Sequence, residues 1–176
     1  MKQGLAMLVL ALAAGAGSAQ VRSESPAPNV VVLKAAHLFD GRDGKLQSPG
    51  LLVVSGGRIA GVGAAAGIPA GARVIDLGDA TLLPGFIDAH VHLTGDHVDD
   101  WAKGFYEGML RPPVEQSFHA EHNAKLTLEA GFTSVRNVGS SDFIDVALRN
   151  AIDGGLVEGP RIIAAGYAIG STGGHC

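Results

Sequence analysis

Two histidines, His90 and His92, lie one residue apart at the end of an apolar segment, LLPGFIDAHVHL, residues 82–93. In an extended strand, side chains two positions apart project from the same face. Their Cβ atoms are then about 6.5 Å apart by strand rise, so both imidazoles can reach one metal ion at about 2.1 Å each. The pattern indicates a metal site. The alternative is that the two histidines are ordinary surface or packing residues.

The expected position of these histidines in the fold favours the metal site. They come at the carboxyl end of a predicted strand, the edge where α/β and barrel proteins place their chemistry. Asp88 precedes them by two residues, and we expect it on the same face, where its carboxylate could accept an imidazole N–H and orient the ring. His175 follows the last predicted strand and is a candidate pocket residue at the same edge.

Two kinds of hydrophobic pattern divide the chain near residue 84. Residues 30–83 contain short β-branched runs separated by turn signals such as Ser55-Gly56-Gly57, which predicts a small antiparallel β module. After residue 84, strands are predicted at GFIDAHVH, FTSVRNVG and PRIIAAGYAI, with helices at VEQSFHAEHNAKLTLEAG and DFIDVALRNAIDGG. This alternation predicts parallel βα units, with a long solvated loop from Leu93 to about Pro113.

The number of predicted elements is too small for a closed barrel. A (β/α)8 barrel takes about 250 residues, and residues 84–176 supply three strands and two helices. The expected fold class is therefore α/β, with a β module at 30–83 and an incomplete larger fold at 84–176. A small open α/β protein is the alternative.

Composition limits the partners and the location of the protein. The chain has 176 residues, 47% of them hydrophobic, and a formal net charge of -4 without a basic stripe, which argues against nucleic acid as a partner. Residues 1–19 read as a signal peptide whose apolar core is too short for a stable membrane anchor, and residues 20–29 as a flexible leader. We therefore expect a periplasmic or secreted protein, and the sequence is compatible with a homo-oligomer.

Several segments resemble one family when taken together. LLPGFIDAHVHL, SGGRIAGVG, EAGFTSVRNVG and EGPRIIAAGYAIGSTGGH, in this order, resemble the metal-dependent amidohydrolase superfamily, in particular its imidazolonepropionase-like and prolidase-like members. The resemblance implies a small N-terminal β-sandwich followed by a TIM-type (β/α)8 barrel that holds one or two divalent ions, usually zinc. His90 and His92 match the metal ligands of the first barrel strand. Asn137 stands where relatives commonly carry aspartate, a change expected to weaken a local hydrogen bond.

The resemblance also implies a reaction. Such proteins hydrolyse C–N bonds with a metal-activated water, and dipeptides or N-acyl amino acids are the expected substrates. The remaining ligands and the catalytic general base are expected downstream of Cys176, so this N-terminal portion alone should be inactive. The alternative is a non-catalytic secreted β module with a metal-binding appendage.

The signal-peptide interpretation makes a direct prediction. Lys2, an apolar core and the small residues Gly17-Ser18-Ala19 should direct export and cleavage after Ala19. Mass spectrometry of the protein from its native host should then find a mature chain that begins near Gln20. Intact Met1 on the recovered protein would contradict this.

Overall fold

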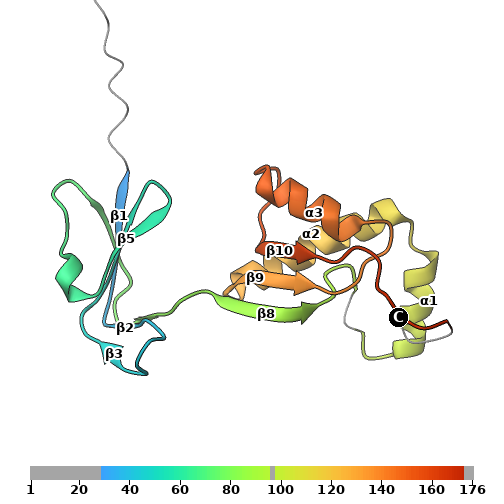
Figure 1. Cartoon of the computed structure of the whole chain (residues 1–176), viewed down its shortest axis with the longest axis horizontal. Helices are drawn as coiled ribbons and strands as arrows, with labels where there is room; N and C mark the ends of the chain where they lie inside the picture. The colour runs from blue at the N-terminus through green and yellow to red at the C-terminus, as the bar shows by residue number, and fades with distance from the viewer. Residues whose placement is uncertain (1–28, 96–97, 173–176) are drawn as a thin grey trace, which may run out of the picture.

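A computed structural model of the chain describes residues 29–95 and 98–172, which form two lobes joined by an extended segment before β8 (Figure 1). The first lobe contains β1 (Val30–Ala35), β2 (His37–Phe39), β3 (Leu46–Gln47), β4 (Gly50–Ser55), β5 (Arg58–Val62), a 3-10 turn (Ala64–Ala66), β6 (Arg73–Asp76) and β7 (Thr81–Leu82). The second contains β8 (Phe86–Val91), α1 (Trp101–Leu110), α2 (Pro113–Glu129), β9 (Phe132–Asn137), α3 (Ile144–Asp153) and β10 (Arg161–Ala164).

The first lobe has two sheets, of strand order β5-β4-β1-β6 and β3-β2-β7. The predicted hairpin between β4 and β5 is confirmed, and Gly56 and Gly57 both take positive φ in its turn, as tight hairpins require. The expectation of a purely antiparallel module is wrong, because β1 runs parallel to β6 and β2 runs parallel to β7. The reason is long-range. The chain passes from the larger sheet to the smaller one twice in the same direction, from β1 into β2 and again from β6 into β7. The strands of the second passage therefore pair in parallel with those of the first.

An ion pair joins the two parallel strands of the larger sheet. Lys34 on β1 and Asp76 on β6 are register partners, and Lys34 Nζ donates to Asp76 Oδ2 at 2.8 Å. This hydrogen bond, helped by one from the Gly78 N–H, holds the pKa of the Asp76 carboxyl below its usual value. Both side chains are about half exposed, so the pair adds little to stability.

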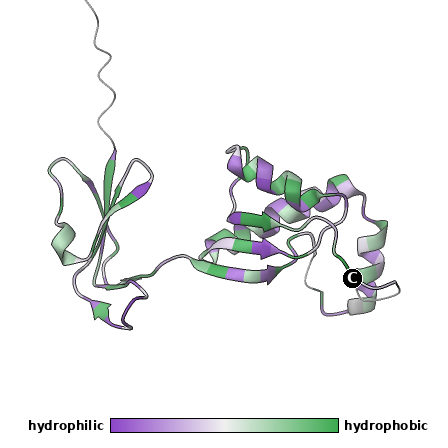
Figure 2. Cartoon of the chain, in the orientation of Figure 1, coloured by the Kyte–Doolittle hydropathy of each residue, from purple (hydrophilic) through white to green (hydrophobic). Residues whose placement is uncertain are grey.

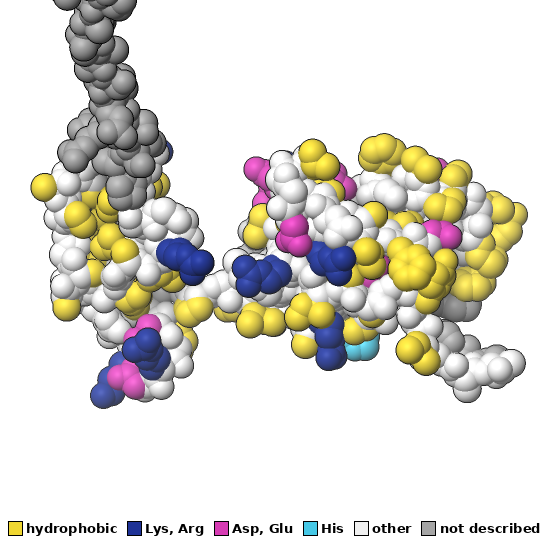
Figure 3. Space-filling view, turned by 45° about the horizontal axis from the view of Figure 1, so that its top comes forward, with side chains coloured by type: hydrophobic (Ala, Val, Ile, Leu, Met, Phe, Trp, Pro, Cys, Tyr) yellow, Lys and Arg dark blue, Asp and Glu magenta, His cyan; other side chains and the backbone are white. Residues whose placement is uncertain are grey.

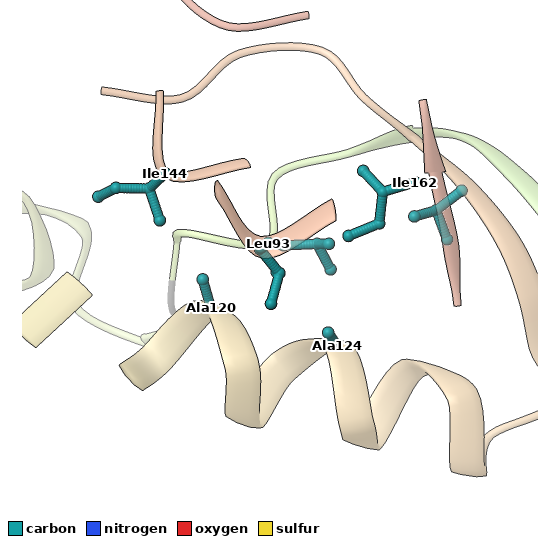
Figure 4. Packing of buried hydrophobic residues seen from close by; sticks show 7 residues of the cluster. Leu93, Ala120, Ala124, Ile144 and Ile162 are labelled. Atoms are coloured by element: carbon teal, nitrogen blue, oxygen red, sulfur yellow. The ribbon is translucent and has the colours of Figure 1, made fainter. Parts of the chain in front are cut away.

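In the second lobe, β8, β9 and β10 form a parallel sheet of order β10-β9-β8, as the alternating pattern predicted. Helices α2 and α3 supply its apolar cover. Ala120 and Ala124, one turn apart on α2, are fully buried and point toward the strands (Figure 4). The cluster that they help to form has these other buried members: Leu93, Val135, Ile144, Leu148 and Ile162.

Helix α1 corrects the predicted loop between the first strand and the first helix. Asp100 caps this helix by accepting the Lys103 N–H at 3.1 Å, and Lys103 approaches Glu107 one turn later at 3.8 Å. Both are recognisable helix signals. The glycines at 104 and 108 lower helix propensity and concealed them. The second lobe therefore has three helices among its described residues, where two were expected. None of these helices combines the length and the apolar character needed to cross a bilayer.

The opposite face of the sheet of the second lobe is largely open. Ile87 on β8 is 74% exposed and Ile163 on β10 is 64% exposed. Apolar side chains reach the surface of both lobes (Figure 3), and hydrophilic residues gather toward the arrowheads of β8 and β9 (Figure 2). The carboxyl ends of the strands thus combine polar side chains with an uncovered face, which is where a site can form.

The tight contact of α2 with its neighbours gives a test of the packing. A Cβ built on Gly159 would lie 3.2 Å from the Ala124 Cβ, so little space surrounds Ala124. Ala124→Leu should lower the free energy of unfolding by about 1–3 kcal/mol through overpacking, as measured by urea denaturation. Lys125→Leu introduces a leucine at an exposed neighbouring position, where no packed space has to accommodate it, and should change the free energy of unfolding by less than about 0.5 kcal/mol. Equal effects of the two substitutions would contradict the packing.

Candidate metal centre

His90 and His92 lie together at the carboxyl end of β8. Their ring centroids are 5.5 Å apart with an interplanar angle of 68°, and both residues are exposed. Their neighbours Val91 and Leu93 pack on the opposite side, against the core cluster under the helices. The alternation of the strand therefore directs both imidazoles to the open face, as the sequence predicted.

A β-bulge in β8 separates Asp88 from the two histidines. Asp88 is the register partner of Val135, and Val91 is the register partner of Asn137, so three residues of β8 span two residues of β9. Such an extra residue interrupts the alternation of a strand. Because register partners project from the same face and Val135 is buried in the core cluster, Asp88 belongs to the helix-covered side. The expectation that Asp88 shares the face of the histidines is wrong.

Asp88 instead binds the backbone of the bulge. Its Oδ1 accepts the N–H of His90 at 2.9 Å, while Arg136 Nε donates to the Ala89 carbonyl at 2.7 Å. Two side chains of opposite charge thus hold both polar atoms of the single peptide unit that joins Ala89 to His90. A bulge leaves such groups without ladder partners, so this pair replaces them and fixes the direction of His90. Arg136 could not be recognised from the sequence, because only the register of β9 places it beside Ala89.

The ring of His92 is oriented from the next strand. Its Nδ1 lies 3.3 Å from the carbonyl oxygen of Gly139, just after β9. A carbonyl can only accept, so this contact requires a proton on Nδ1 and leaves the Nε2 lone pair available. The same arrangement, with the second nitrogen hydrogen-bonded to a backbone carbonyl, is usual for histidines that bind metal ions.

The described residues offer two candidate metal ligands. Two exposed imidazoles on one face, one of them with its Nε2 free, fit a borderline-soft ion such as zinc. In the part of the chain that the structure describes, no group of three or more His, Cys, Asp or Glu side chains could hold a metal ion. His175 and Cys176 lie outside the described residues. The assignment of His90 and His92 as ligands therefore stays a prediction.

A cavity of about 400 Å³ opens beside His92, between the loop after β8 and helix α1. Its polar lining includes Thr94, Glu107, Arg111 and Ser141. Glu107 and Arg111 were missed because they fall in the segment interpreted as a loop. A larger cavity of about 530 Å³ in the first lobe has no histidine in its lining, so the smaller one is the candidate substrate site.

The histidine pair lies at the carboxyl edge of a parallel sheet, where α/β and barrel proteins carry their functional sites. Comparison with known families agrees. Residues 81–174, more than half of the chain, match the model of the Amidohydrolase family. The chain therefore belongs to the amidohydrolase family, and the resemblance in the sequence is confirmed.

Individual relatives fall in the same group. The ochratoxinase of Aspergillus niger is 29% identical over 151 residues, which are 83% of this chain and 30% of that protein. The structure of a Xaa-Pro dipeptidase with bound methionine in its active site is similar with a TM-score of 0.71 and 35% identity, covering 83% of this chain and 35% of that one. The crystal structure of A. niger ochratoxinase gives a TM-score of 0.69 at 28% identity, covering 85% and 34% of the two chains. The chain spans about a third of the length of these relatives.

The role of Asp88 can be tested separately from that of the histidines. Asp88→Ala removes the acceptor for the His90 N–H, so the ring of His90 should lose its fixed direction and metal affinity should fall by about tenfold or more. Asp88→Asn keeps an acceptor oxygen and should remain close to the parent protein. Isothermal titration of the metal-free protein with Zn²⁺ measures both. Unchanged affinity in the alanine variant would exclude this role.

Proposed function

We propose that this chain is the N-terminal portion of an exported, metal-dependent hydrolase that cleaves C–N bonds of amide or peptide-like substrates. The observation that carries the proposal is the pair His90 and His92 on the open face at the end of β8, within the segment that matches the family. The Xaa-Pro dipeptidase and a structurally similar prolidase complexed with n-methylphosphonate-l-proline support a peptide-like substrate.

The proposed architecture follows from the two lobes. Residues 30–83, with their two sheets, would form the small β-sandwich module, and residues 84–176 would form the beginning of a (β/α)8 barrel. Three features support the barrel: β8, β9 and β10 are parallel and sequential, α2 and α3 cover one face, and the other face exposes Ile87 and Ile163. Five further strands would close the barrel around that exposed face.

In this proposal His90 and His92 hold one or two divalent ions, zinc being favoured by their nitrogen ligands. A divalent ion, when bound, supplies Lewis acidity to the scissile carbonyl and to the attacking water. The residues of this chain do the positioning: Asp88 and Arg136 fix the backbone at His90, and the Gly139 carbonyl keeps the proton on Nδ1 of His92. Further ligands and the general base would come from residues beyond this chain.

The cavity beside His92 suggests the kind of substrate. Its lining has one acidic and one basic side chain, Glu107 and Arg111, and its volume suits a molecule of a few residues' size. A dipeptide or an N-acyl amino acid carries the carboxylate and the amide that such a lining can bind. Arg111 also approaches Glu115 at 3.5 Å, which holds its guanidinium near the cavity.

The proposal is tested by replacing both histidines. His90→Ala/His92→Ala in the full-length protein should abolish hydrolysis of dipeptides and N-acyl amino acids and remove bound zinc, because two of the ligands are lost. His122→Ala, at an exposed position on α2, is the matched control and should leave both unchanged. Residues 20–176 alone should show no turnover. Full metal content in the double variant, or turnover by residues 20–176, would refute the corresponding part of the proposal.

A further inference from the structure

Two buried polar side chains lie behind the histidine pair and take no part in the function described so far. Asn137, the last residue of β9, and Asp145, in the first turn of α3, are both fully buried. A buried carboxylate is costly unless hydrogen bonds satisfy it. The bonds that these two residues make therefore show what the cluster holds in place.

Asn137 uses every polar atom of its side chain. Its Oδ1 accepts the N–H of Leu93 at 2.8 Å, which fixes the chain just after His92. Its Nδ2 donates both protons, to the carbonyl oxygen of Gly139 and to Asp145 Oδ2, each at 3.1 Å. An aspartate has no amide protons and could not make the last two bonds. The asparagine therefore makes two hydrogen bonds here that an ionised aspartate could not make.

Asp145 extends the cluster to the third strand. Its Oδ2 also accepts the N–H of Gly166, after β10, at 3.0 Å, and its Oδ1 accepts the Val146 N–H at 2.8 Å. Its own N–H is bonded to Ser140 Oγ at 3.3 Å. The pair thus ties together the segments that leave the carboxyl ends of β8, β9 and β10, which is the edge where the metal site is proposed.

The link to the metal site is the Gly139 carbonyl. The same oxygen that accepts from Asn137 Nδ2 also contacts His92 Nδ1, at 3.1 and 3.3 Å respectively. Asn137 thus orients this carbonyl from the buried side, and the carbonyl in turn orients the ring of His92 on the exposed side. Loss of the amide donor would free the carbonyl to rotate and would release the ring.

We propose that Asn137 and Asp145 are positioning residues that fix the Gly139 carbonyl and thereby keep His92 protonated on Nδ1, with Nε2 directed to the metal ion. The metal-binding part rests on the proposed function. The choice of tautomer does not, because it is a property of the metal-free protein.

Two substitutions separate positioning from simple stability. Asn137→Asp breaks the bonds to Gly139 and to Asp145. The exchange variant Asn137→Asp/Asp145→Asn restores an amide–carboxylate pair between the two side chains, yet position 137 still has no donor for the Gly139 carbonyl. The exchange should therefore recover part of the thermal stability lost in Asn137→Asp, although the amide nitrogen at position 145 can no longer accept the Gly166 N–H, while the defect at His92 persists. If Asn137 and Asp145 served stability alone, the exchange would recover the thermal stability and the behaviour of His92 together.

Two measurements on the full-length protein read the outcome. Nitrogen-15 NMR of the metal-free protein at pH 8 should show His92 as the Nδ1–H tautomer in the parent and a shift toward the Nε2–H tautomer in both variants. Titration with Zn²⁺ should show affinity reduced by about tenfold or more in both. Val135→Ala, which shortens a core side chain on the same strand, is the control for destabilisation and should keep the parent tautomer.

The results that would overturn the proposal are distinct. An Nε2–H tautomer of His92 in the parent protein would overturn the proposal by itself. This measurement needs no variant, so it holds even if the substitutions prevent folding. A folded exchange variant with parent tautomer and parent zinc affinity would also do so. If His90→Ala/His92→Ala binds zinc like the parent, the proposed function fails, whereas the tautomer measurements still decide the positioning role.

Discussion

Packing of α2 and α3 against a single face of the β8–β9–β10 sheet determines how the rest of the second lobe is arranged. Ala120 and Ala124 are small enough for α2 to lie directly on the strands, and Val135 and Ile162 fill the space beneath the helices. Burial of these side chains fixes which face of each strand is inward. The histidines at 90 and 92 are consequently directed to the face that no described helix covers.

The histidines are held by backbone-directed hydrogen bonds that come from different elements. Asp88 and Arg136 bind the peptide unit between Ala89 and His90. The carbonyl oxygen of Gly139 accepts a hydrogen bond from Nδ1 of His92. Each bond replaces a ladder hydrogen bond that the bulge or the end of a strand leaves unmade. Hydrogen bonds of this kind fix the direction of a side chain.

The barrel that we propose would account for an open face that is apolar as well as polar. Exposed Ile87 and Ile163 have no use in a sheet that faces water, but they suit the packed interior of a closed barrel. The chain covers about a third of its relatives, and a barrel closed by further strands would bury these residues.

The sequence by itself determined the local features of this protein. The runs of β-branched residues, the glycine turn at 56–57, the helices after Pro113 and Ser141, and the shared face of His90 and His92 follow from backbone preferences and from the periods of strand and helix. The capping residue Asp100 is also a local signal for α1, although the glycines at 104 and 108 oppose it. Tertiary structure alone decided the parallel pairing of β1 with β6, the bulge that moves Asp88 away from the histidines, the contact of Arg136 with Ala89 and the buried pair Asn137–Asp145. These depend on strand register and on partners from 8 to 47 positions away along the chain, and residue type does not encode which distant backbone group will lie within hydrogen-bonding distance.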